Sequence, residues 1–286
     1  MRNIILLVCL VNFVFSQSTE IFNYSLNYTG DVNNNLSGGI KKGSVYIGKV
    51  LASLNVNTGF LGVEKGNFSA SVLNSHGSKF SEKFVGDLQT LSNIENDNAT
   101  YIYELWYSYN FDDLTFKIGY IDLNSDFIIM KSAETFLNSS LQVFPNLSLN
   151  YPLSIFPRPN FGVHLDYKFN DNNILRLAYF DVEEVSNTKL MLNTKLFNDN
   201  YYNIIAEYDY QSELVNAKLG TFYQNKVADI NDFLAFYSGI EYKLQDDINI
   251  FAQIGLNSKN NVDCKNYVAG GYYLVNHLVL IMIKSV

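Results

Sequence analysis

The sequence predicts an all-β protein of the transmembrane antiparallel β-barrel class. Several stretches of about ten residues alternate between apolar and polar types, which is the period of a strand with two unlike faces. The 286-residue chain contains 21 tyrosines and 21 phenylalanines but only one tryptophan and four prolines. After residue 16, no stretch approaches the ~20 apolar residues that a membrane-spanning helix needs. In lipid, a sheet satisfies its backbone groups only as a closed barrel.

The N-terminal residues have the composition of a signal peptide. Arg2 supplies a positive charge, residues 4–15 form an apolar run too short for a spanning helix, and Ser16 ends a suitable cleavage site. We therefore predict export and a signal peptide over residues 1–16.

The remaining residues, 17–286, read as one domain because no linker divides them. Cleavage of the signal peptide would remove Cys9, which leaves Cys264 as a single thiol and excludes an internal disulfide. The domain must then be held by hydrogen bonding and packing.

The alternation of apolar and polar residues is weak near the N-terminus and becomes regular from about residue 101. Residues 21–28 predict a short strand that ends at a run of turn residues from Gly30, and two further strands are expected over 44–56 and from Phe68. The asparagine-rich residues 75–100 predict an exposed loop. The clearest hairpin joins 101–111 to 114–120 across Asp112-Asp113.

Three more hairpins follow in the second half of the chain. Their strands are expected at 161–169 and 175–179, at 202–210 and 215–223, and at 236–244 and 248–256. Short polar turns alternate with longer connections, as in barrels whose periplasmic turns are short and whose external loops are long. A strand of about eleven residues, tilted by about 45°, covers roughly 25 Å of membrane thickness. We count about twelve strands.

Residues 126–160 show no strand alternation, and so long a segment inside a compact domain usually has a function. We expect it to fold into the barrel and to narrow it. If the aromatic strand faces point outward, the opposite faces place charged residues in the lumen. The predicted pore-lining and solute-contact residues, with two from the inserted segment, are Glu104, Trp106, Lys117, Glu134, Arg158, His164, Asp166, Lys168, Arg176, Glu207, Asp209, Lys218, Glu241 and Lys243.

Two interpretations stay open for these residues. The charges either contact a hydroxyl-rich solute or merely solvate a wet interior. Trp106 either stacks on a sugar ring, anchors at the membrane interface, or packs against the inserted segment.

The acidic balance, 20 Lys and Arg against 28 Asp and Glu for a formal net charge of −8, argues against nucleic acid as a partner. Aromatic rings at alternate strand positions suit the lipid headgroup region of an outer membrane. A homo-oligomer is compatible with the sequence.

The first half of the chain resembles the carbohydrate-selective porins, the OprB-like family. The matching pieces run in family order from Tyr28 to about Val163. They are YTGD and NLSGG after Asn27, G-x-x-Y-x-G-x-V from Gly43, VGDLQTLSNIE from Val85, then YELWYSYNF, KIGYIDLNSDF, TFLNSS and FGV.

The resemblance implies passive, sugar-selective diffusion through a water-filled barrel of about sixteen strands in the outer membrane of a Gram-negative bacterium. It implies no cofactor and no catalysis. Because the sequence shows only about twelve strands and ends in the apolar run HLVLIMIKSV, we expect a C-terminally shortened member. A smaller closed barrel and a non-conducting remnant are the alternatives.

The sequence argues against two other functions. A secreted glycan-binding β-protein would have shorter strands and a polar outer face. An outer-membrane phospholipase-type hydrolase would need a nucleophile and a base that face each other, whereas neighbours in the stretch 74–78 (NSHGS) point to opposite faces of a strand. No metal-ligand spacing or nucleotide-binding loop occurs, so we expect no enzyme and no cofactor.

Overall fold

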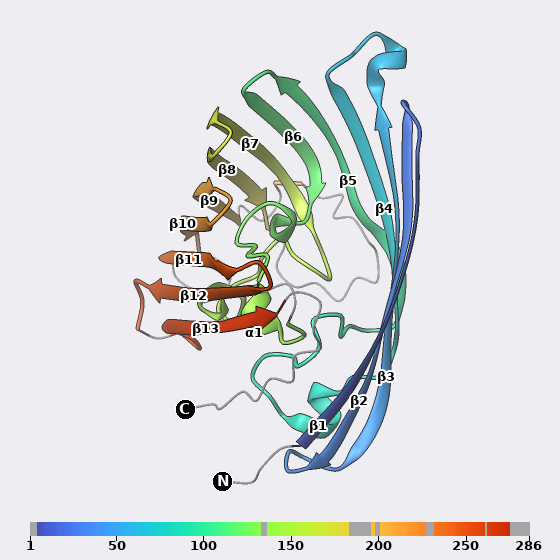
Figure 1. Cartoon of the computed structure of the whole chain (residues 1–286), viewed down its shortest axis with the longest axis vertical. Coiled ribbons are helices and arrows are strands. Elements are labelled where there is room, and N and C mark those ends of the chain that lie inside the picture. The colour runs from blue at the N-terminus through green and yellow to red at the C-terminus, as the bar shows by residue number, and fades with distance from the viewer. Residues whose placement is uncertain are drawn as a thin grey trace.

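The computed structural model describes residues 5–132, 136–182, 196–197, 201–226, 232–260 and 262–274. Thirteen strands in these ranges form one antiparallel sheet, in which each strand pairs with the next along the chain. The sheet curls so that its concave face surrounds the short helices and the connecting segments (Figure 1). The strands are β1 (Ile5–Ser18), β2 (Phe22–Ser37), β3 (Gly43–Asn57), β4 (Gly66–Gly77), β5 (Ala99–Phe111), β6 (Leu114–Ile121), β7 (Asn160–Asn170), β8 (Asn173–Asp181), β9 (Tyr202–Gln211), β10 (Val215–Gln224), β11 (Phe233–Gln245), β12 (Ile248–Asn257) and β13 (Asn266–Leu274).

The helical elements are single turns within the connections. They are η1 (Thr58–Leu61), η2 (Ser81–Val85), η3 (Leu123–Ser125), α1 (Ser139–Gln142) and α2 (Pro145–Ser148). Among the described residues, no helix has the length and apolar character needed to cross a membrane.

The two ends of the sheet differ in their connections, as the sequence predicts. Turns of two or three residues close β5–β6 at 112–113, β7–β8 at 171–172, β9–β10 at 212–214 and β11–β12 at 246–247, and we call this edge the short-turn end. The opposite edge, the long-connection end, carries 78–98 and 122–159. This is the asymmetry of outer-membrane barrels, whose short turns face the periplasm.

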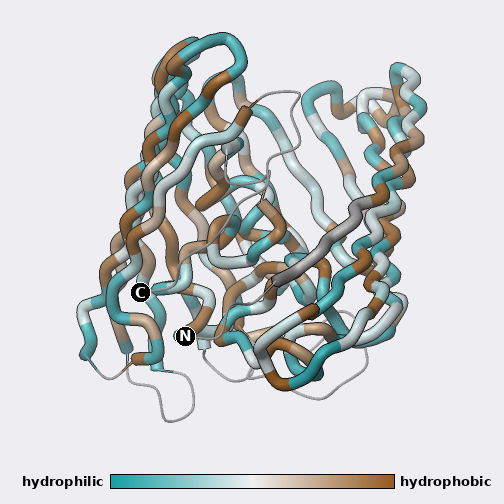
Figure 2. Tube along the Cα trace, turned by 60° about the horizontal axis from the view of Figure 1, so that its bottom comes forward, coloured by the Kyte–Doolittle hydropathy of each residue, from teal (hydrophilic) through white to brown (hydrophobic). Residues whose placement is uncertain are grey.

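Alternation along each strand separates the two faces. In β9, Ile205, Glu207 and Asp209 are buried on the concave face, whereas Tyr208 and Tyr210 are exposed on the convex face. Apolar and polar positions consequently alternate along the strands in the hydropathy trace (Figure 2). The period-2 prediction for this part of the chain is confirmed.

Aromatic rings gather at both ends of the convex face. Near the short-turn end, Tyr167 and Phe169 lie 4.9 Å apart between ring centroids. At the long-connection end, Tyr202 stacks on Tyr179 at 5.5 Å and contacts Tyr223 at 6.2 Å. Exposed aliphatic side chains lie between the two levels; they include Leu177, Leu219, Ile240 and Ile254. An apolar band between two aromatic levels is the surface that a lipid bilayer favours.

The prediction for the first part of β5 was wrong about its faces. Tyr101 and Tyr103 are buried on the concave side, because the pairing of β4 with β5 shifts register between Ala70 and Val72. The backbone N–H of Glu104 donates to Ser71 Oγ at 3.1 Å within this bulge. One extra residue in β5 therefore brings Glu104 to the concave face beside Tyr103.

The turn predicted at Gly30 was also wrong. Strand β2 continues to Ser37, and Val32 faces outward while Asp31 and Asn33 are fully buried on the concave side. Residues that usually favour turns are accommodated because 78–98 covers this part of the sheet.

That covering segment was predicted as an exposed loop, and the structure corrects this. Phe80 and Ile94 are buried against Ile47 of β3. Ser92 Oγ donates to Asp31 Oδ2 at 2.5 Å. The apolar residues in 75–100 are too widely spaced to show a strand period, but they pack against the concave face once the sheet curls around them.

Replacing Asn35 with alanine is expected to loosen residues 78–98. Asn35 is 1% exposed, and its Nδ2 lies within 3.1 Å of the carbonyls of Gly38, Lys41 and Phe84. Loss of this donor would leave buried carbonyls unpaired and cost about 1–3 kcal/mol. Limited proteolysis of the refolded protein should show faster cleavage within 78–98. Asn34→Ala, on the opposite face of the strand, should leave the cleavage rate unchanged; equal rates in the two variants would contradict the prediction.

Strand β1 differs from the rest of the sheet. It pairs with β2 from Ile5 to Ser18, yet every described side chain of 11–18 is exposed, whichever face it occupies. β1 and β13 both run from the long-connection end to the short-turn end, so these two edges cannot join in an antiparallel ladder. β2 and β13 run in opposite directions.

Candidate functional site

Charged residues of β6 to β10 meet on the concave face because strand register makes them neighbours. Lys117 of β6 pairs with His164 of β7, and Arg176 of β8 lies between Asp166 of β7 and Glu207 of β9. On the other side of β9, Lys218 of β10 pairs with Asp209. Each strand contributes every second residue to this face, so the charges line up across the sheet. We call the eight residues Lys117, Asp126, His164, Asp166, Arg176, Glu207, Asp209 and Lys218 the charged network.

One half of the charged network surrounds His164. Lys117 Nζ contacts Asp126 Oδ2 at 2.5 Å, and the same oxygen lies 3.3 Å from His164 Nδ1. The other ring nitrogen, Nε2, is 2.7 Å from Asp166 Oδ1. Burial acts to raise the pKa of Asp126, but hydrogen bonds from His164 and the charge of Lys117 hold the pKa well below its usual range. Asp126 therefore stays ionised and connects the inserted segment to two strands.

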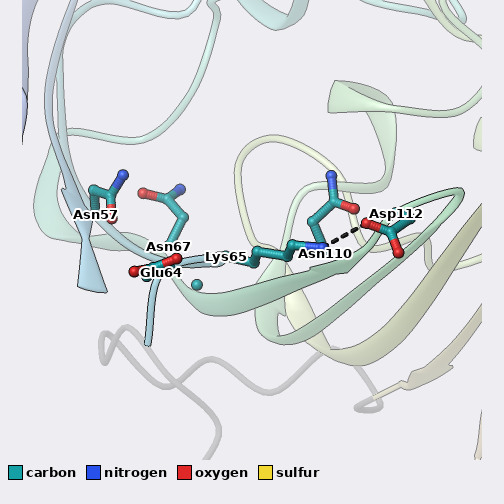
Figure 3. A pocket seen from close by; sticks show the side chains of 7 residues that line it. Asn57, Glu64, Lys65, Asn67, Asn110 and Asp112 are labelled. Carbon is teal, nitrogen blue, oxygen red and sulfur yellow. Dashed lines mark hydrogen bonds and ion pairs between the residues drawn. The ribbon is translucent and has the colours of Figure 1, made fainter. Parts of the chain in front are cut away.

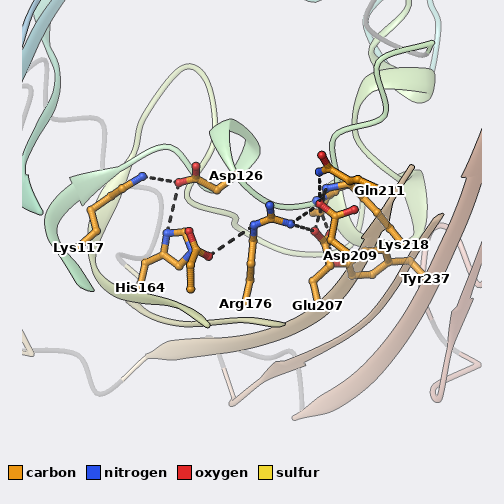
Figure 4. A network of polar contacts seen from close by, with 11 residues as sticks. Lys117, Asp126, His164, Arg176, Glu207, Asp209, Gln211, Lys218 and Tyr237 are labelled. Carbon is orange, nitrogen blue, oxygen red and sulfur yellow. Dashed lines mark hydrogen bonds and ion pairs between the residues drawn. The ribbon is translucent and has the colours of Figure 1, made fainter. Parts of the chain in front are cut away.

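The other half is built on Arg176 and Glu207 (Figure 4). Arg176 Nη1 lies 2.6 Å from Asp209 and 3.3 Å from Glu207, and its Nε is 3.5 Å from Asp166. Lys218 Nζ contacts Glu207 at 2.9 Å. Glu207 and Asp209 are 0% exposed, so these cations compensate charges that would otherwise be unpaired in the interior.

The charged network is nearly balanced. Three cations, Lys117, Arg176 and Lys218, face four carboxylates, and His164 lies between two of these. The long-range field of such a cluster is small because opposite charges lie within a few ångströms of each other.

Three predicted acidic residues also fix the inserted segment. Glu207 Oε2 accepts from the backbone N–H of Ile128 at 2.7 Å. Glu241 accepts from the N–H of Ser132 at 2.5 Å, and Glu104 accepts from the N–H of Asp122 at 3.0 Å. These carboxylates therefore position 122–159 against the sheet.

Apolar packing completes the attachment of this segment. Phe127, Ile128 and Met130 join a buried cluster on the concave face, together with Phe144 and Leu147. Strand residues of the same cluster are Phe180, Ile205, Phe222, Phe233, Tyr237 and Phe251. The half of the concave face formed by β8–β13 is consequently filled by side chains.

The other half of the concave face is polar and uncharged near the short-turn end. Strands β2–β5 place small hydroxyl and carboxamide side chains in register there, with pairs such as Asn55 opposite Ser69 and Asn67 opposite Ser108. We call this surface the neutral wall; it comprises Ser25, Asn27, Ser53, Asn55, Asn57, Asn67, Ser69, Ser71, Ser108 and Asn110.

The remaining predicted residues occupy separate places. Trp106 packs against the buried cluster, and Lys117 Nζ lies 4.8 Å from its ring centroid, which favours the packing interpretation over an interfacial anchor. Lys168 is exposed, Lys243 is half-buried, and both pair with turn carboxylates, so they lie apart from the charged network. Arg158 is exposed in the inserted segment, and Glu134 lies outside the described residues.

Sequence reasoning missed Tyr237, whose hydroxyl donates to Glu207 Oε2 at 2.8 Å. Tyr237 directly follows the outward-facing Phe236 in β11, so strand alternation alone would have placed it on the concave face. Gly220 on the neighbouring strand provides space for the ring, since a Cβ there would lie 2.0 Å from Tyr237 Cζ. Asp126 was within the predicted segment but was not singled out.

The comparisons with known proteins agree with this architecture. A family model described as "Carbohydrate-selective porin, OprB family" matches residues 41–276. No curated protein shows a significant match. The structure is similar to the high-pH structure of Pseudomonas putida OprB, with a TM-score of 0.77 and 14% sequence identity, over 88% of this chain and 70% of that chain. The low-pH structure of the same protein gives a TM-score of 0.56 over the same coverage.

The family match spans more than half of the sequence, and the similar structures share its antiparallel sheet. The family match points to a channel of the outer membrane rather than to an enzyme. The protein belongs to the carbohydrate-selective porin, OprB family.

Proposed function

We propose that the protein lets small neutral carbohydrates diffuse passively across the outer membrane through a water-filled pore. The observation that carries this proposal is that one concave face contains both a nearly balanced charged network and the neutral wall. A neutral, hydroxyl-rich solute exchanges its hydration for hydrogen bonds with such a surface. An ion that enters the pore loses hydration energy, and the weak net electrostatic field of this surface offsets little of that loss.

Passage in this mechanism depends on geometry and hydrogen bonding, without covalent chemistry. The inserted segment 126–160 would narrow the pore from within, since Phe127 and Phe144 hold it against β8–β13 and leave the side of the neutral wall for solute. Arg176 and Lys218, whose side chains keep 11% and 12% exposure, would supply donors at the narrow part, and their buried carboxylate partners would hold them in place. The narrowest point then selects solutes by size and by hydrogen-bonding groups.

The N-terminal leader also belongs to this proposal. The exposure of both faces of β1 over 11–18 fits a segment that has no place in the mature sheet. Without β1, twelve described strands remain, and β2 and β13 run in opposite directions as an antiparallel closure requires. Mass spectrometry of protein isolated from outer membranes should show a mature N-terminus near residue 17. Recovery of the uncleaved chain from that membrane would contradict this part.

Conductance across a planar bilayer tests the proposed function. Purified, detergent-refolded protein should form stable channels, and added glucose should reduce their ionic current in a concentration-dependent manner. Channels whose current glucose leaves unchanged would refute sugar passage. Membrane-inserted, folded protein that forms no channels would refute the pore itself, and with it the closure of the sheet.

A further inference from the structure

A polar pocket lies on the neutral wall at the short-turn end (Figure 3). Its volume is about 430 Å³, within the range of small-molecule sites. The hairpin turns β3–β4 and β5–β6 frame it. Its lining residues are Asn57, Glu64, Lys65, Gly66, Asn67, Asn110 and Asp112.

Strand register places the carboxamides of this pocket on the concave face. Asn57 pairs with Asn67, and Asn67 pairs with Ser108. Along β5, Asn110 follows Ser108 by two residues and Trp106 precedes it by two, so all three share one face. Trp106 packs against the buried cluster of that face, which establishes that the pocket faces the interior of the curled sheet.

Several polar groups of the pocket are free to bind a solute. In the described part of the chain, the side-chain amides of Asn67 and Asn110 and the carboxylate of Glu64 form no hydrogen bond with the protein. Asn57 uses only its Oδ1, which accepts from the N–H of Gly59 at 2.8 Å. Lys65 is held by Asp112, with Nζ and Oδ1 2.5 Å apart, and this ion pair closes one side.

The pocket lies beside one end of the charged network. Ser108 pairs with Lys117, and Asn110 pairs with Thr115 two residues nearer the short-turn end. Two residues along a strand span about 7 Å. A solute that leaves the charged network toward the periplasmic side therefore meets these carboxamides next.

We propose that this pocket is a weak binding subsite for a neutral monosaccharide at the periplasmic mouth. The inference rests on the proposed passage of sugars and adds a site at which a sugar binds transiently. A carboxamide presents a donor and an acceptor side by side, and neighbouring sugar hydroxyls can engage both. Lys65 and Asp112 cancel each other, so Glu64 leaves one negative charge, which disfavours anionic sugar derivatives.

Single-channel recording with glucose in one compartment at a time tests the subsite. Glucose added on the short-turn side of the wild-type channel should block the current more often than glucose added on the other side, because the subsite lies nearer that entrance. Gluconate, an anionic sugar derivative of similar size, should give shorter blocks. Asn67→Ala and Asn110→Ala should each shorten the glucose blocks about two- to tenfold, because each removes one or two neutral hydrogen bonds.

The control is Asn249→Ala, which removes a concave-face carboxamide at the short-turn end of β12, away from the pocket. Its blocks should match those of the wild-type channel. Glucose blocks that are unchanged in both pocket variants would overturn the subsite and leave the proposed function intact. Absence of any glucose effect on open wild-type channels would overturn both.

A second measurement does not depend on conduction. Saturation-transfer NMR between refolded protein in detergent and glucose should show transfer that weakens in Asn67→Ala and Asn110→Ala but persists in Asn249→Ala. Equal transfer in all four proteins would place the sugar elsewhere and overturn the subsite.

Discussion

Replacing Glu207 with leucine is expected to destabilise the folded protein by about 3–5 kcal/mol, because it removes one partner of a buried ion network. Glu207 is 0% exposed and accepts from Arg176, Lys218 and Tyr237. It also accepts from the N–H of Ile128, so the substitution detaches the start of the inserted segment. Urea titration of refolded protein, followed by the fluorescence of the single tryptophan, Trp106, measures the loss.

Two further variants separate charge from shape. Glu207→Gln keeps an acceptor for the N–H of Ile128 but leaves Arg176 and Lys218 undercompensated, so it should lose part of the same free energy. Glu213→Leu removes an exposed carboxylate from the β9–β10 turn and should change stability by no more than about 0.5 kcal/mol. A loss below about 1 kcal/mol for Glu207→Leu would show that the network does not hold the fold.

The alternation of the second half of the chain was sufficient to predict β7–β12, whereas β13 was not predicted. In β7–β12 the turns at the short-turn end have two or three residues and the convex face is apolar, so Arg176, Glu207 and Lys218 could be assigned to the inside from parity alone. Their pairing could not be predicted, because it depends on which residues of adjacent strands lie opposite each other. One residue of slip would have moved every charge to the lipid face.

The first half of the chain shows where this reasoning fails. The bulge in β5 inverts the faces on either side of Tyr103, and no residue in YIYELW marks the position of the extra residue. The polar end of β2 was predicted as a turn because its local sequence contains no information about the segment that covers it. Asn35 is buried only because 78–98 folds back over the strand, a contact between residues 49 positions apart. Local propensity could not reveal it.

The predicted acidic residues also have a structural role that strand periodicity does not reveal. Glu104 and Glu241 were expected to face solute, yet Glu104 accepts from the N–H of Asp122, just before the inserted segment, and Glu241 accepts from the N–H of Ser132 within it. An unpaired backbone N–H in the interior would be costly, so an inward-folding segment needs such acceptors along its path. Acidic residues on the concave face therefore serve two needs, and sequence alone does not divide them.

Replacing Arg176 with glutamine is expected to make the pore cation-selective. The charged network would keep Lys117 and Lys218 against four carboxylates, and its net charge would fall by one unit. A unit charge about 8 Å from a permeating ion, at an effective dielectric constant near 40, contributes about 1 kcal/mol. The change favours a cation and disfavours an anion by about that amount each, so the ratio of cation to anion permeability should rise about thirtyfold, measured as a shift of the reversal potential in a salt gradient.

A positive charge can also be removed at a position where the structure predicts no effect on ion selectivity. Lys168 lies at the short-turn end of β7, exposed to solvent and paired with Asp171 at 2.8 Å. Lys168→Gln should leave the reversal potential nearly unchanged, since bulk ions screen exposed charges within about 10 Å. Arg176→Lys keeps the charge and should retain most of the wild-type selectivity. A shift of equal size in Arg176→Gln and Lys168→Gln would mean that net charge, rather than the balance of the buried network, controls which solutes enter.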